Sequence, residues 1–209
     1  METQQSIIDI CAEEGIQKDP VTLRKIFLLA LRNHYADPEQ NFGGVPKNFK
    51  NFKYSDDETE RTVDIDLDYV FDNYKLDQRP VIFVGFGNFK FEKQVLNNYI
   101  DNTADYAATG FYNITNTQCI IRHVSKEPDE ALKMGVITTA FFRGLRTTLM
   151  HSFSLKSFEV TQLSKPQMLD NTADKQFEVV AAIELAYQDY WQTFIESHRI
   201  KKINYGNVL

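Results

Sequence analysis

Residues 119–149, CIIRHVSKEPDEALKMGVITTAFFRGLRTTL, contain the clearest change from strand to helix in this chain. The run begins with β-branched residues that are typical of a strand. Pro128 is then placed to begin a helix, and acidic residues follow in its first turn. An apolar stripe runs along this segment at helical spacing: Met134, Ile137, Phe141, Leu145 and Leu149. We expect a strand followed by a long helix, about residues 128–150, whose stripe needs a sheet or helix to cover it.

Four further segments have the patterns of strands. Residues 81–86, VIFVGF, form a β-branched and aromatic run that suits a buried strand. Residues 63–68 alternate apolar and acidic side chains, which predicts a strand with one solvated face. Residues 155–160 predict another strand, and the polar stretch 97–117 separates the strands around it. The longest alternation predicts a long strand, although its alanines leave a helix possible: Phe177, Val179, Ala181, Ile183, Leu185 and Tyr187.

The N-terminal part of the chain differs from the rest. Apolar residues recur at helical spacing between Leu23 and Tyr35, and residues 6–14 predict a shorter helix. Glycines and prolines without an apolar period follow, as is typical of a long loop. We therefore expect an N-terminal helical extension at 1–38, an extended aromatic and polar arm at 39–61, and an α+β domain at 62–209. The sheet of that domain, mixed or mainly antiparallel, should be backed by the long helix.

Composition excludes several classes of protein. The 209 residues are 43% hydrophobic and 25% charged, which fits a folded domain rather than a disordered or fibrous chain. The net charge of -6 predicts no basic footprint for nucleic acid, so no sequence-specific nucleic-acid partner is expected. No run suits a membrane span or a signal peptide, so we expect a soluble, intracellular protein without a membrane partner. Cys11 and Cys119 lie in unrelated segments, which argues against a disulfide framework or a redox motif.

The arm carries an alternation of basic and aromatic residues. Residues 47–54, KNFKNFKY, interleave lysines with Phe49, Phe52 and Tyr54. This pattern is similar to a stacking platform for single-stranded nucleic acid. The acidic run at 56–60 follows at once and would repel phosphates. We therefore favour an arm whose exposed aromatic side chains dock on a neighbouring protein.

Motifs that carry chemistry are incomplete. Gly85-Phe86-Gly87 follows a strand, but Lys90 stands where a dinucleotide-binding loop needs its third glycine, and no P-loop follows. Residues 64–68, DIDLD, open like a calcium loop but lack its glycine and its final acid. These carboxylates would hold Mg²⁺ only with residues from elsewhere, so a solvated strand face is favoured. The histidines lie in different segments without zinc spacing: His34, His123, His151 and His198. We expect no catalytic, metal-binding or cofactor-binding residue and no cofactor. An enzyme with a dispersed metal-dependent site is the remote alternative.

Segments of this chain follow one another as strand, Pro-started helix, strand, Ser-x-Pro and long strand. They are RPVIFVGF (79–86), the 119–149 run, SLKSFEVTQLSKP (154–166) and QFEVVAAIELAYQDYW (176–191). This order, over about residues 63–195, resembles that of tail-terminator and neck proteins of tailed bacteriophages. The chain up to Arg61 departs from the smallest members of that family.

The resemblance implies a structural virion protein, not an enzyme, that closes into a ring, commonly a hexamer. Such a ring caps the tail tube and joins the tail to the head. The implied partners are therefore other copies of this chain, the tail tube protein and the head-completion or connector protein. The implied location is the tail or neck of a virion assembled in the host cytoplasm. Aromatic residues are the interface candidates: Phe49, Phe52, Tyr54, Phe86, Tyr187 and Trp191. Another neck, head-completion or baseplate adaptor is the alternative function.

Overall fold

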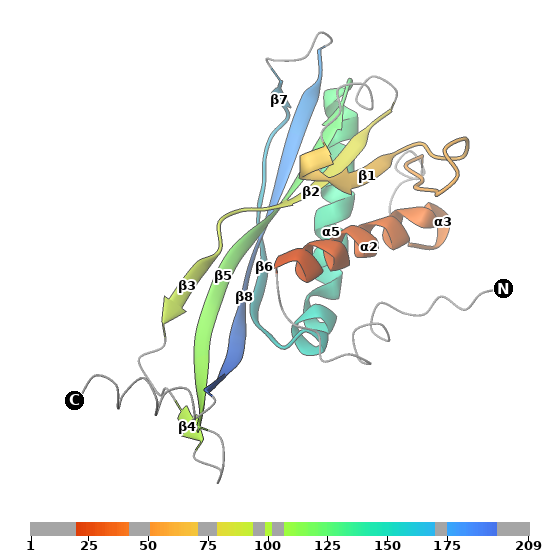
Figure 1. The fold of residues 1–209 in the computed structure, drawn as a ribbon. Coiled ribbons are helices and arrows are strands. Elements are labelled where there is room, and N and C mark those ends of the chain that lie inside the picture. The colour runs from red at the N-terminus through yellow and green to blue at the C-terminus, as the bar shows by residue number, and fades with distance from the viewer. Residues whose placement is uncertain are drawn as a thin grey trace, which may run out of the picture.

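The fold is α+β, as the sequence predicts: a mixed sheet carries a long helix on one face, and an N-terminal helix precedes the sheet (Figure 1). A computed structural model describes residues 20–41, 51–70, 79–93, 99–101, 107–169 and 175–195. The shorter helix expected at 6–14 lies outside these residues. Within them, no helix is long and apolar enough to cross a membrane.

The helices and strands are these. The helices are α2 (Pro20–Ala36), α3 (Pro38–Asn41) and α5 (Pro128–Ser152), with a 3-10 turn, η2 (Asp68–Val70). The strands are β1 (Asp64–Leu67), β2 (Val81–Phe86), β3 (Lys90–Lys93), β4 (Tyr99–Asp101), β5 (Ala107–Ser125), β6 (Leu155–Leu163), β7 (Gln167–Met168) and β8 (Phe177–Ile195). The long helix therefore begins at Pro128, as expected, and ends close to the expected boundary.

The strands form one sheet in the order β1-β2-β5-β8-β6. Strand β1 runs parallel to β2, and every other pairing is antiparallel. The short strands β3 and β4 add to β5, and β7 adds to β8. The sheet is therefore mixed but mainly antiparallel, in agreement with the sequence.

Strands β5 and β8 form a ribbon that is longer than the rest of the fold. Each has 19 residues, and they pair without interruption from Ala107 opposite Ile195 to Ser125 opposite Phe177. At about 3.4 Å per residue the ribbon is roughly 60 Å long. Its lower part extends past α2 and α5 (Figure 1). The ribbon thus has a covered half, in which residues 177–187 of β8 pack under the helices, and a distal half, residues 188–195 of β8 with the residues of β5 opposite them.

The core lies between the sheet and its helices. On β8 the odd-numbered residues from Val179 to Tyr187 are at most 2% exposed, which confirms the alternation predicted there. Helix α5 covers them with Met134, Ile137, Phe142 and Leu149. Helix α2 adds Phe27, whose ring centroid lies 5.2 Å from that of Phe142. Both helices therefore share one hydrophobic core with the sheet.

Two details differ from the sequence prediction. The polar stretch 97–117 is not simply an excursion between strands, because β4 and the first half of β5 lie in it. Thr115 and Thr117 lie on the buried face opposite residues of β8, so pairing with that strand determines the local structure. The expected solvated face of β1 is also wrong at Asp64, which is only 8% exposed.

Candidate functional site

The aromatic residues of the predicted arm belong to the core of their own chain. Phe52 is 5% exposed and Tyr54 is 7% exposed, and both pack in the main hydrophobic cluster. The backbone N–H of Tyr54 donates to the carbonyl of Tyr35 on α2 at 2.9 Å. The expectation that these two rings are exposed on an arm is therefore wrong. Phe49 lies outside the described residues.

The ring of Tyr54 is held between two guanidinium groups. Those of Arg32 and Arg61 each lie 5.1 Å from the ring centroid, at a distance that suits cation–π attraction. The phenol donates to the carboxylate of Asp56 at 3.2 Å. Burial raises the pKa of Tyr54, and the positive charge of Arg32 opposes that shift. These contacts attach the segment before β1 to helix α2.

The carboxylates of β1 are paired with arginines. Asp64 lies 2.9 Å from the guanidinium of Arg61 and 3.5 Å from that of Arg79. Asp66 lies 3.9 Å from Arg32. In the part of the chain that the structure describes, no three histidine, cysteine or acidic side chains gather in a way that could hold a metal ion. The DIDLD run is therefore part of an ion-pair network that joins β1 to the segments around it.

The remaining interface candidates lie along the sheet. Phe86 is half-buried and its ring lies 5.5 Å from that of Phe27 on α2. Tyr187 is 2% exposed and faces the helices. Trp191 lies on the distal half of β8, opposite Phe111, and its side chain is outside the described residues. The structure thus brings Phe52, Tyr54 and Tyr187 into one core cluster rather than onto one surface.

A buried chain of hydrogen bonds joins both helices to the sheet. The phenol of Tyr35 lies 3.1 Å from the hydroxyl of Thr138 on α5, which lies 2.9 Å from Nε2 of His123 on β5. The other ring nitrogen, Nδ1, lies 3.0 Å from the carbonyl of Val179 on β8. Since a carbonyl only accepts, Nδ1 carries the proton and Nε2 accepts from Thr138 in the neutral ring. Sequence reasoning did not find this cluster, because its members are far apart in the chain.

Burial controls the ionisation of these groups. Burial lowers the pKa of His123 to about 4, and the hydrogen bond to Val179 opposes that shift. Burial also lowers the pKa of His34, which stacks on Phe141, to about 4. The pKa of the buried Cys119 thiol is raised, chiefly by burial. All three side chains are therefore neutral near pH 7, and their contacts are those of a packed interior.

Shallow hollows lie on both faces of the sheet within the described surface. A hollow of about 520 Å³ lies on the face of the sheet opposite the helices, and its rim is mainly polar, with Lys90, Gln118 and Glu184. A hollow of about 230 Å³ lies between α5 and β6. Phe142 and Phe158 line its floor, and Arg143 and Arg146 line its helical wall.

Several strand edges are unpaired within the described residues, and two of them belong to β6 and to the distal part of β8. Strand β6 ends the sheet and pairs only with β8. Beyond Gln188, strand β8 pairs only with β5, because the register with β6 ends at Tyr187. Unpaired edges present rows of N–H and C=O groups that can bind another strand.

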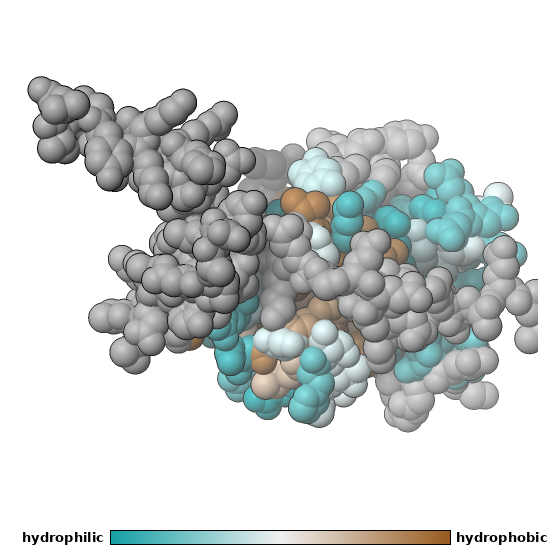
Figure 2. All heavy atoms as spheres, turned by 60° about the horizontal axis from the view of Figure 1, so that its bottom comes forward, coloured by the Kyte–Doolittle hydropathy of each residue, from teal (hydrophilic) through white to brown (hydrophobic). Residues whose placement is uncertain are grey.

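Apolar side chains on the described surface are scattered. Among the residues that are coloured by hydropathy in Figure 2, hydrophilic ones predominate and hydrophobic ones show in areas between them. The most exposed large apolar side chains come from five elements, with two of them on α2: Val21, Leu29, Tyr69, Phe91, Val136 and Met168. The unpaired edges are therefore the more distinctive surface feature.

Comparison with known proteins gives no family for this chain. No protein-family model matches the sequence, and no curated protein matches it either.

Proposed function

We propose that this protein is a structural subunit of a phage particle that forms a ring, caps the tail tube and joins the tail to the head connector. One observation carries the proposal: the β5–β8 ribbon continues past the helices that cover it (Figure 1), and beyond Tyr187 the outer edge of β8 has no strand partner among the described residues. A strand edge of this kind binds neighbouring chains through backbone hydrogen bonds.

The proposed mechanism is subunit addition at the end of the tube. Each copy places its distal ribbon against the next copy, and the ring closes when the rotation between neighbours completes a circle. A closed ring presents the same surface several times, so weak contacts with the terminal tube ring add up to firm binding. Once the tube end is covered, further tube subunits have no site to join.

The first test is electron microscopy of the purified protein in negative stain at a low and a high concentration. We expect closed rings with a central hole, most of them six-fold. The same grids with purified tail tubes should show one extra ring at a tube end. Uniform small particles that also fail to bind tubes or connectors would contradict the proposal.

A truncation separates the ribbon from the folded core. A chain that ends after Gln188 loses the distal half of β8 but keeps every residue that pairs with β6. We expect this variant to keep the helical circular dichroism of the core and to lose rings. Trp191→Ala, which changes one residue of the distal strand, should weaken ring formation. Rings that persist after truncation would show that the ribbon is not the contact.

The alternatives give different results in the same experiments. A head-completion or baseplate adaptor would bind head or baseplate parts and leave tube ends bare. A metal-dependent enzyme would show a Mg²⁺-dependent activity that is lost in an Asp64→Ala, Asp66→Ala variant. The ion pairs of both aspartates argue for the structural role.

A further inference from the structure

Two guanidinium groups line the hollow between α5 and β6 and have no partner among the described residues. Arg143 and Arg146 are exposed, lie three residues apart on α5 and line the same hollow. Within the described residues, neither side chain makes an ion pair or a hydrogen bond. Glu159 on β6 is the one acidic residue that lines the hollow with them. The hollow therefore combines an apolar floor with a net positive rim.

An acidic loop, residues 55–60, lies elsewhere on the same chain. It is exposed, and two of its acids are already used: Glu60 pairs with Lys53 at 2.8 Å, and Asp56 accepts from Tyr54. Asp57 and Glu58 make no ion pair with any described residue. These two carboxylates are thus available to a basic partner.

Hydrogen bonds from two arginines and a threonine hold the acidic loop in one conformation. Arg61 donates to the carbonyls of Ser55 and Asp56, and Arg79 donates to that of Glu58. The Asp57 carboxylate accepts from the backbone and the hydroxyl of Thr59. A loop that is ordered before it binds loses little conformational entropy on binding.

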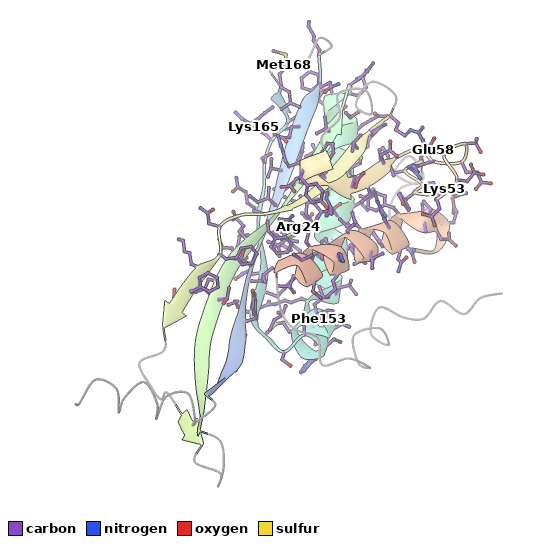
Figure 3. The ribbon with its side chains drawn as sticks, viewed as in Figure 1. Arg24, Lys53, Glu58, Phe153, Lys165 and Met168 are labelled. Carbon is purple, nitrogen blue, oxygen red and sulfur yellow. The ribbon has the colours of Figure 1, made fainter. Side chains whose placement is uncertain are left out.

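Within one copy, no ion pair joins the described residues of the loop to Arg143 or Arg146. Glu58 lies at the side of the molecule that carries α3, whereas Phe153 lies at the lower end of α5 (Figure 3). A second copy can supply the loop to the hollow. A contact between two different surfaces of identical chains is head-to-tail, and this type of contact forms rings.

We propose that the acidic loop of one copy binds the hollow between α5 and β6 of the next, with Asp57 and Glu58 against Arg143 and Arg146. The proposal rests on the proposed ring, and it adds to the ribbon contact a second pair of surfaces that meet between neighbouring copies. The opposite charges set which surfaces meet. Paired guanidinium and carboxylate groups at a protein surface also predict weaker assembly at high salt.

Charge reversal tests this contact in the full chain. The first variant is Arg143→Glu with Arg146→Glu, and the second is Asp57→Asn with Glu58→Arg. Asparagine at 57 keeps an oxygen that can accept from Thr59, so the loop keeps its turn. Sedimentation velocity of wild type should show concentration-dependent rings. Each variant alone should associate at least about tenfold more weakly, because like charges then face each other.

An equimolar mixture of the two variants is the decisive test. In alternating rings one contact is wild type, and in the other the arginine that replaces Glu58 in the second variant faces the two glutamates of the first, so opposite charges meet at both contacts. The mixture should therefore recover rings that neither variant forms alone. Unchanged circular dichroism and melting temperature control for folding, since all four positions are exposed. Variants that associate like wild type, or a mixture that stays dissociated, would overturn the contact but leave the ring itself standing. Wild type that stays monomeric at every concentration would overturn this self-contact, whereas binding to tail tubes judges the proposed function separately.

Discussion

Nε2 of His123 lies 2.9 Å from the hydroxyl oxygen of Thr138, so a ring buried in the middle of the sheet is bonded to the helix that covers it. The hydroxyl donates to Nε2 only while the ring is neutral. Protonation would place a second N–H against Thr138 and force this hydroxyl to accept instead. The contact therefore links the protonation of one histidine to the packing of α5 on the sheet.

Stability should fall in mild acid because of His123. Burial lowers the pKa of this residue from 6.5 to about 4, so the unfolded chain binds the proton more readily than the folded one. The contribution of the neutral His123 ring to the free energy of unfolding is fully present above about pH 6.5. It is lost as the pH falls toward 4, by roughly 3 kcal/mol in all. Urea unfolding of wild type and His123→Gln at several pH values measures this. The variant should be less stable at pH 7.5 but lose less between pH 6.5 and 4. Equal losses in both proteins would contradict the prediction.

A methyl group should be costly at Gly135 and harmless at Gly144, although both lie on α5. A Cβ on Gly135 would lie 2.8 Å from Leu163 and 3.0 Å from Val179, whereas one on Gly144 meets nothing within 4 Å. Gly135→Ala should lower the free energy of unfolding by about 1–3 kcal/mol, because it overpacks the contact between helix and sheet. Gly144→Ala should raise it by up to ~1 kcal/mol through helix propensity. Denaturant titration of both variants measures the two changes in the free energy of unfolding. If Gly135→Ala were as stable as Gly144→Ala, the helix would not be packed closely on the sheet at residue 135.

The sequence predicts the elements whose pattern is local. Pro128 and the apolar stripe that follows define α5, and the alternation from 177 to 187 defines the covered half of β8. Their spacing predicts a long helix whose apolar stripe needs a sheet or a helix to cover it and a strand with one buried face, and the structure packs the two together. The distal half of the ribbon lacks such a signal, since its strands continue beyond the helices that bury alternate side chains.

The partners of the buried groups were beyond the reach of sequence reasoning. Phe52 and Tyr54 lie in a segment without apolar period, and their burial depends on α2 and on the arginines around them. His123 likewise meets Thr138 only because α5 folds back on β5. The interface candidates share only their aromatic character, and aromatic character does not distinguish an exposed ring from a ring in the core.

The ion pairs of Asp64 should contribute more to the free energy of unfolding than an exposed ion pair does. Asp64 is only 8% exposed and lies between Arg61 and Arg79, so Asp64→Ala leaves two guanidinium groups without their carboxylate. We expect a loss of about 2–4 kcal/mol in the free energy of unfolding. The matched control is Glu60→Ala, which removes an exposed pair with Lys53 and should cost less than ~1 kcal/mol. Similar losses in urea unfolding would show that the Asp64 network is as solvated as the surface pair.

Phe52→Ala should destabilise the chain itself rather than only its assembly. The ring is 5% exposed within the main core, and removal of a buried phenylalanine side chain typically costs about 3–5 kcal/mol. Phe91→Ala is the matched control, because that ring is 64% exposed and its loss should change stability by less than ~0.5 kcal/mol. Deletion of 39–61 would remove Phe52 and Tyr54 together, so it would unfold the domain before it tested any contact between subunits. Urea unfolding of the two point variants avoids this. If Phe52→Ala were as stable as Phe91→Ala and lost only its rings, the segment would be a docking arm after all, and its packing against α2 would be incidental.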